Sequence, residues 1–204
     1  PDAARLTEAE IKLYKANVRF MRAAYHYYLM ELYGPVPIVD HSMTLEDNLD
    51  LPRNSLDEVI AFIDKELKEC MEEMAQEPYH DNENLRAVPT KGAALALRAK
   101  LWVYAASPLF NGNSAYKNWT NHDGTVLMPQ TYDKELWKDA ADAAKTVIDM
   151  TEYQLLKPAA DATFDEIVDN LRAVTTTWGA GKNTEIIWGH PNSVQWYGMC
   201  ALPA

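Results

Sequence analysis

Residues 16–38 read ANVRFMRAAYHYYLMELYGPVPI, and this stretch decides the fold class. Together with Ile11 and Tyr14, which precede it, this stretch has apolar side chains at intervals of three and four. The spacing places them on one face of an α-helix: Ile11, Tyr14, Val18, Met21, Tyr25, Tyr28 and Leu32. Phe20, Ala24 and Tyr27 form a second stripe, so we expect this helix to pack on more than one side. A capping box at Thr7 and Glu10 predicts its start, and Gly34 with Pro35 predicts its end.

Two further helices are expected in the middle of the chain. Ser55 with Glu58 is a capping box, and the apolar stripe that follows, which includes Cys70, predicts a helix closed before Pro78. Residues 90–107 form an alanine-rich segment that stops before Pro108. Alanines on several of its faces predict close approach of neighbouring helices, with larger side chains such as Trp102 filling the gaps.

The second half of the chain carries weaker helical patterns. Residues 133–150 predict a fourth helix whose inner face carries Trp137. A short fifth helix is expected from Thr163, with Phe164 among its buried residues, and residues 186–188 are the only plausible strand. The pattern predicts an all-α fold of tetratricopeptide-like helical hairpins with long irregular loops, with an irregular helical domain as the alternative.

Two polar segments stand outside these helices. The loop at 110–131 holds several asparagines together with Tyr116 and Trp119. The tail after Trp188 combines amides and aromatic rings in the same way, in Asn192, Gln195, Trp196 and Tyr197. Loops of this length are more often functional or disordered than incidental, so these segments are expected to form surface rather than core.

The composition excludes several classes of protein. Acidic residues outnumber basic ones, 30 to 19, for a net charge of −11, and no basic cluster interrupts this pattern, so we expect no nucleic-acid partner. No apolar run has the length of a membrane span, and residues 1–5 show no signal peptide. The cysteines Cys70 and Cys200 have no metal-ligand spacing, and Cys70 is expected to be a small buried thiol.

Ordered motifs throughout the chain resemble the SusD/RagB family. Residues 16–29 followed by 32–38 are similar to the signature helix of that family and the LYG-x-VP turn after it. Further stretches resemble it in the expected order: 53–59 (RNSLDEV), the helix at 90–104, 106–112 (ASPLFNG) and 183–188 (NTEIIW).

The resemblance implies a carbohydrate-binding protein of the outer membrane. Residues 1–204 would form a single SusD-like helical domain within a longer chain, whose lipidated N-terminus and C-terminal half lie outside this sequence. The protein would be a surface-exposed lipoprotein that captures a glycan or oligosaccharide beside a TonB-dependent, SusC-like transporter. Its only link to the membrane would be that lipid anchor.

Sugar recognition needs an aromatic ring against the C–H face of a pyranose and polar groups at its hydroxyl rim. The tail cluster of Trp196, Tyr197, Asn192 and Gln195 is therefore the first candidate site, and Tyr116 with Trp119 is the second. Either set of aromatics could instead pack within its loop. The helical tyrosines near residue 25 are expected to be core, His26 a hydrogen-bonded helix residue, and Arg19 and Arg22 partners of nearby carboxylates.

No enzyme is predicted. The chain lacks a GxSxG elbow, an HExxH motif, a P-loop and a GxGxxG turn, and its histidines show no metal-ligand spacing. No catalytic residue, metal site or cofactor is therefore expected. A helical protein–protein scaffold without glycan binding is the alternative function.

Overall fold

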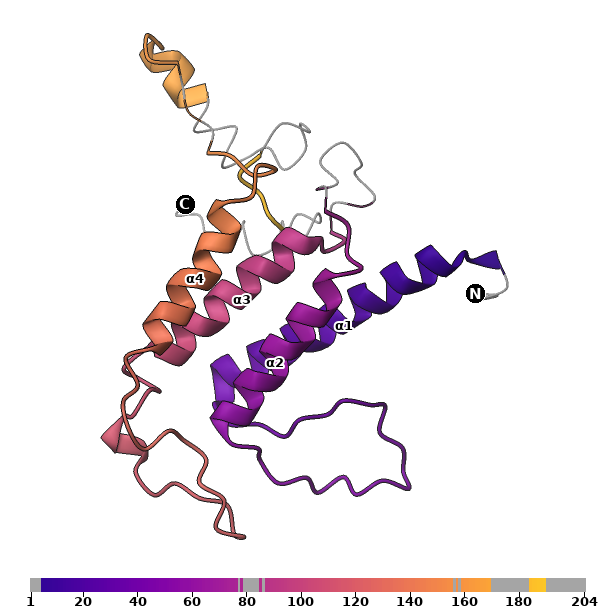
Figure 1. Ribbon diagram of the computed structural model, residues 1–204, viewed down its shortest axis with the longest axis vertical. Coiled ribbons are helices and arrows are strands. Elements are labelled where there is room, and N and C mark those ends of the chain that lie inside the picture. The colour runs from indigo at the N-terminus through magenta and orange to yellow at the C-terminus, as the bar shows by residue number, and fades with distance from the viewer. Residues whose placement is uncertain are drawn as a thin grey trace, which may run out of the picture. The chain divides into compact units, whose positions relative to one another are not determined.

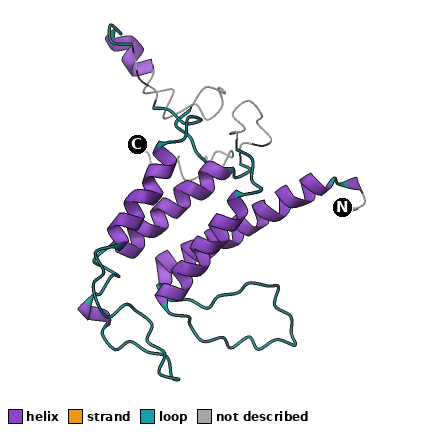
Figure 2. Ribbon diagram, viewed as in Figure 1, coloured by secondary structure: helices purple, strands orange, loops and turns teal. Residues whose placement is uncertain are grey.

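A computed structural model describes residues 5–76, 78, 85, 87–155, 157, 159–169 and 184–189. Figure 1 shows the main helices, which are α1 (Glu8–Tyr33), α2 (Leu56–Met71), α3 (Lys91–Ala106) and α4 (Leu136–Ile148); the short 3-10 helix η2 (Ser114–Tyr116) lies before α4. No strand occurs in this part of the chain, so the predicted all-α class is confirmed (Figure 2). None of its helices is both long and apolar enough to cross a bilayer.

The chain divides into two compact units. The first contains residues 1–76 and 90–150, and the second contains residues 77–89 and 151–204. In the first unit α1 packs along α2 and α3 packs along α4, while α2 also contacts α3 (Figure 1). These are the helical hairpins of a tetratricopeptide-like fold, as predicted.

The helix boundaries follow the signals in the sequence. The Thr7 side chain accepts a hydrogen bond from the Glu10 amide, and the Glu10 carboxylate accepts one from the Thr7 amide; Ser55 and Glu58 repeat this box at α2. Gly34 ends α1 with φ of 68°, a left-handed value that glycine adopts without strain. The predicted starts of α1 and α2 are therefore confirmed.

The core of the first unit lies where α1, α2 and α3 meet. α1 contributes Phe20, Ala24 and Tyr27, and the other two helices contribute mainly Ile63, Leu67, Leu97 and Leu101, all of them buried. Cys70 is a buried free thiol whose pKa is raised to about 12 by burial, so it stays protonated, as expected of a structural cysteine.

Buried ion pairs join α2 to its neighbours. Glu66 is 3% exposed and accepts hydrogen bonds from Arg19 Nε at 3.1 Å, Arg19 Nη2 at 2.9 Å and Arg22 Nε at 3.0 Å. Asp64 similarly accepts from Arg98 Nε at 2.6 Å and from Trp102 Nε1 at 2.8 Å. The expected pairing of Arg19 and Arg22 with carboxylates is confirmed.

His26 has a structural role. It is buried, and the Val39 amide donates to its Nε2 at 3.2 Å. Because Nε2 is thereby the acceptor, Nδ1–H donates to the Arg22 carbonyl at 2.8 Å. The prediction of a hydrogen-bonded helix residue is confirmed.

The prediction that the main apolar stripe of α1 lies in the core is wrong. Of its members, Tyr14, Val18, Tyr25, Tyr28 and Leu32 are exposed. The smaller second stripe is the one that packs, because Phe20, Ala24 and Tyr27 face α2 and α3. A period of three and four identifies an apolar face but does not tell which neighbour covers it.

Trp137 also differs from its prediction. It lies on α4 but is 43% exposed, and its Nε1 donates to the Tyr132 hydroxyl at 3.1 Å. The buried positions of α4 are instead the small residues Ala140 and Ala143. A large indole does not fit where two helices approach closely, so Trp137 lies at the edge of the contact.

In the second unit, the described residues form short local structures. Residues 164–169 are helical and begin at the predicted Thr163–Glu166 capping box, but Phe164 is exposed rather than buried. Residues 186–188 are not a strand; Trp188 is half-buried and its Nε1 donates to the Ala87 carbonyl at 2.9 Å.

Candidate functional site

The structure brings one of the two predicted binding pairs together. Tyr116 and Trp119 lie with ring centroids 6.0 Å apart and planes inclined by 33°, and Trp119 is 37% exposed. The tail cluster of Asn192, Gln195, Trp196 and Tyr197 lies outside the described residues and stays a prediction.

Tyr116 and Trp119 line a hollow of about 300 Å³. Its walls come from three places: the end of α1 with the turn after it, the end of α3 with the residues after it, and the loop itself. The lining residues are Glu31, Leu32, Tyr33, Gly34, Pro35, Tyr104, Phe110, Tyr116, Trp119 and Met128.

The loop that carries Trp119 is folded back on itself. Leu127 N donates to the Trp119 carbonyl at 3.0 Å, and Asn121 N donates to the Thr125 carbonyl at 3.0 Å, with a turn at Gly124. Leu56 N donates to the Leu127 carbonyl at 2.8 Å, which ties this hairpin to the start of α2. These backbone hydrogen bonds therefore fix the position of Trp119, although it lies in a polar loop.

Asn111 and Gly112 close the base of the loop. The Asn111 side chain donates a hydrogen bond to the backbone carbonyl of Asp133 at 2.7 Å and accepts one from the backbone N–H of Asp133 at 2.8 Å. Gly112 has φ of 70°, and a Cβ there would lie 2.3 Å from the Tyr132 nitrogen. Asn111 is 2% exposed, so it is a structural residue, contrary to its expected place on a polar surface. The Asn-Gly pair holds the end of α3 beside the start of α4.

Arg53 positions the indole of Trp119. Its guanidinium lies 5.7 Å from the Trp119 ring centroid and donates to the carbonyls of Tyr33 at 3.2 Å and Pro35 at 3.0 Å. The Asn121 side chain donates to the Arg53 carbonyl at 2.8 Å. Arg53 thus connects the turn after α1 with the loop that carries Trp119.

Tyr104 and Phe110 form a second aromatic pair in the hollow. Their rings are stacked, with centroids 4.1 Å apart and planes inclined by 18°. The Tyr104 hydroxyl donates to the Met30 carbonyl at 3.2 Å. Burial and the negative charge of Glu31 raise the pKa of Tyr104 to about 12, so this hydroxyl keeps its proton at neutral pH.

The hollow combines flat aromatic rings with groups that exchange hydrogen bonds. The Glu31 carboxylate can accept from hydroxyl groups, and the phenols of Tyr33 and Tyr116 can donate and accept. The arrangement suits a ligand with apolar faces and a hydroxyl rim. In the described residues no group of three or more His, Cys, Asp or Glu side chains could hold a metal ion.

The sequence reasoning missed most of the walls of this hollow. The lining residues Glu31, Tyr33 and Tyr104 were not predicted as site residues. Arg53, which contacts the Trp119 ring without lining the hollow, was not predicted either. Tyr33 belongs to the LYG-x-VP motif and Arg53 to the RNSLDEV motif. The fold brings the two motifs together, since the Arg53 guanidinium donates to the Tyr33 carbonyl.

Comparison with known proteins gives a consistent result. Residues 3–104 match a SusD-like family described as starch-binding associating with outer membrane. A SusD-like protein of Bacteroides ovatus is 25% identical over 140 residues, which are 68% of this chain and 23% of that protein.

Solved structures share the fold. The protein BT4246 is 27% identical with a TM-score of 0.82, over 94% of this chain and 37% of that protein. A SusD-like protein from Bacteroides fragilis is 23% identical with a TM-score of 0.61, over 90% of this chain and 28% of that protein. At this level of identity the likeness supports the fold alone. The chain therefore spans well under half the length of these relatives.

Proposed function

The chain belongs to the SusD-like family, and from this premise we propose that it binds carbohydrate through the hollow beside Tyr116 and Trp119. The family description supplies the class of ligand, since it names starch binding in association with the outer membrane. The arrangement of rings and polar groups in the hollow supports this location for the site.

The observation that carries the proposal is the pairing of Tyr116 with Trp119 in the lining of a hollow to which Glu31 also contributes. A pyranose presents a C–H face to an aromatic ring and a rim of hydroxyls to polar neighbours, and both kinds of group line this hollow. Its volume of about 300 Å³ is at the lower end of the range typical of small-ligand sites. A short stretch of a glycan, rather than a whole polymer, is the ligand that suits it.

The wider role follows from the family. We infer that the protein acts as the glycan-capturing, surface-exposed component of a TonB-dependent uptake complex, beside a SusC-like transporter and held to the outer membrane by a lipid anchor. In this role it binds the glycan without hydrolysing it. The tail residues Trp196, Tyr197, Asn192 and Gln195 are retained as a second proposed set of contacts.

The test is a binding measurement with starch and a panel of other neutral polysaccharides, by affinity electrophoresis and calorimetry. Trp119→Ala should weaken binding at least about fivefold, because losing a stacked aromatic contact costs roughly 1 kcal/mol. Trp137→Ala is the matched control, since its indole is similarly exposed, at 43% against 37%, and does not line the hollow. This control should bind as the parent does.

The other outcomes separate the competing explanations. Binding that survives Trp119→Ala but is lost in Trp196→Ala would move the site to the tail. Failure of the parent to bind any polysaccharide would reject glycan binding by this chain and favour the scaffold alternative. Release of reducing sugar by the purified protein would contradict a non-catalytic role.

A further inference from the structure

A second, larger hollow adjoins the one that contains Trp119. Its volume is about 610 Å³, and it is formed by the last turns of α1, the second half of α3 and the residues after α3. All of these segments belong to the first compact unit. Six residues line this hollow and not the first: Tyr27, Ala99, Lys100, Val103, Ser107 and Leu109.

The two hollows share one wall. Glu31, Tyr104 and Phe110 line both of them. The rings of Tyr104 and Phe110 are stacked with their centroids 4.1 Å apart, so the common wall is an aromatic surface. A ligand in the hollow beside Trp119 therefore lies next to rings that also face the second hollow.

The chemistry of the second hollow differs from that of the first. Val103 and Leu109 contribute exposed aliphatic side chains, at 48% and 53% exposure. Both hydroxyl groups on the α3 side already have partners: Tyr104 donates to the Met30 carbonyl, and Ser107 accepts from the Leu109 amide at 3.4 Å. The walls therefore suit an apolar group better than another ring of sugar hydroxyls.

Two charged side chains limit what this apolar group can be. Lys100 Nζ lies 5.5 Å from the centroid of the Tyr27 ring, and an ammonium has three donors, so it can also donate to a carbonyl oxygen of a ligand. The Glu31 carboxylate in the shared wall repels an anion. A neutral ester is therefore favoured over a free carboxylate.

We propose that the second hollow binds an aromatic acyl group esterified to the glycan, an inference that rests on the proposed function. The aromatic ring lies against Tyr104 and Phe110, the ester carbonyl accepts from Lys100, and the sugar that carries the ester lies beside Trp119. A cavity of about 150 Å³ is enough for benzene, so the volume of about 610 Å³ holds a substituted ring with its linker. An acetyl group would leave most of this space unfilled.

The test compares one oligosaccharide with and without its aromatic ester. The probes are a feruloylated arabinoxylan oligosaccharide, the same oligosaccharide after mild alkaline removal of the ferulate, and methyl ferulate alone. Calorimetry measures the two oligosaccharides, and saturation-transfer NMR measures methyl ferulate. We expect the ester to bind at least about fivefold more tightly than its de-esterified form, because ring stacking is added. Methyl ferulate should bind without any sugar.

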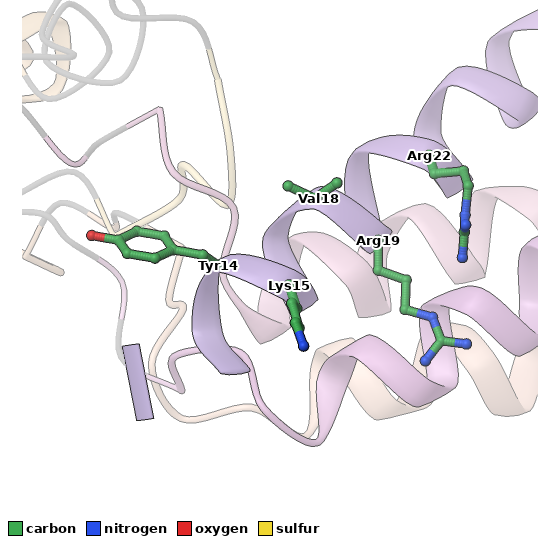
Figure 3. A pocket seen from close by; sticks show the side chains of 5 residues that line it. All are labelled: Tyr14, Lys15, Val18, Arg19 and Arg22. Atoms are coloured by element: carbon green, nitrogen blue, oxygen red, sulfur yellow. The ribbon is translucent and has the colours of Figure 1, made fainter. Parts of the chain in front are cut away.

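Val103→Gln and Val18→Gln are a matched pair of variants. Val103 lines the second hollow but not the first, whereas Val18 lines neither and is 70% exposed on α1. Figure 3 shows Val18 pointing away from the side of α1 that carries Arg19 and Arg22. Val103→Gln should remove most of the preference for the ester and weaken the binding of methyl ferulate, and Val18→Gln should retain both. Lys100→Met removes the donor, so it should also reduce the preference, and it replaces Val103→Gln if that variant does not fold.

Three results would overturn the proposal. The first is equal binding of the two oligosaccharides together with no binding of methyl ferulate. The second is binding of methyl ferulate that neither Val103→Gln nor Lys100→Met weakens, which would place it elsewhere. The third is a dimer of the parent that Val103→Gln dissociates, which would assign the hollow to a second copy of the chain.

Failure of the proposed function gives a different result. Methyl ferulate that binds and is weakened by Val103→Gln, while no polysaccharide binds, would reject glycan binding and still support the second hollow as a site for an aromatic ester.

Discussion

The helix pairs α1–α2 and α3–α4 are held together in different ways. Between α1 and α2 lie large apolar side chains such as Phe20 and Ile63, with the Glu66 carboxylate bound by arginines of α1 at the edge of this contact. α4 instead buries only Ala140 and Ala143 of its helical residues. Its large side chains Trp137 and Ile148 remain exposed.

This difference shows that one fold can use two kinds of helix contact. The first depends on a buried charge having its partners, so removing a partner is costly. The second depends on small side chains that let two backbones approach, so adding volume is costly. Each contact should therefore fail under a different substitution.

The largest effect is expected from Glu66→Ala in the α1–α2 contact. This change leaves Arg19 and Arg22 without their shared carboxylate, and breaking a buried pair typically costs 3–5 kcal/mol; because both guanidinium groups are a third exposed, we expect about 3 kcal/mol. Chemical denaturation measures it. Glu69→Ala is the control, since that carboxylate also contacts Arg19 but is 41% exposed, and it should cost less than about 1 kcal/mol. Equal losses in the two variants would mean that burial of Glu66 is unimportant.

A smaller effect is expected from Ala143→Leu in the α3–α4 contact. Ala143 is 1% exposed, and forcing extra methylenes into a packed contact costs roughly 1–3 kcal/mol. Ala141→Leu places the same side chain on the exposed side of α4 and should leave the unfolding free energy nearly unchanged. A destabilised Ala141→Leu with a normal Ala143→Leu would reverse the assignment of the buried face of α4.

The smallest effect is the response of the α2 contacts to acid. Burial by itself raises the pKa of Glu66, but hydrogen bonds from Arg19 and Arg22 and their positive charges outweigh it and hold that pKa below 4.5. For Asp64, burial is likewise outweighed by hydrogen bonds from Lys68, Trp102 and Arg98, which hold the pKa below 3.8.

Since both pKa values are lower in the folded state, the stability they contribute is present above about pH 4.5 and is lost as the pH falls through the folded values. Denaturation curves between pH 7 and pH 3 should show this loss. Hydrogen bonds from Thr7 and Ser55 also lower the pKa values of the capping carboxylates Glu10 and Glu58, so these groups lose stability in acid as well. Glu66→Gln should therefore reduce the pH dependence without removing it, and an unchanged pH dependence would contradict the assignment to Glu66.

The candidate site could be predicted only in part. Tyr116 and Trp119 stood out because aromatic rings in an asparagine-rich loop have no helical period to explain them. Glu31, Tyr33 and Arg53 could not be assigned in the same way, because each looks like an ordinary helix or turn residue until the loop folds against it. The polar composition of the loop at 110–131 predicts an exposed Asn111, whereas its buried hydrogen bonds to Asp133 depend on a residue 22 positions away.

The sequence by itself determined where α1 and α2 begin, where α1 ends and that the fold is all-α. Capping boxes, glycine and proline act through neighbours only a few residues away, so their effect can be deduced locally. The tertiary structure decided which apolar face of α1 enters the core, that α4 packs through its alanines rather than Trp137, and which residues surround the hollow. These outcomes depend on contacts between segments distant in the chain, and hydrophobic burial favours whichever face finds a complementary surface.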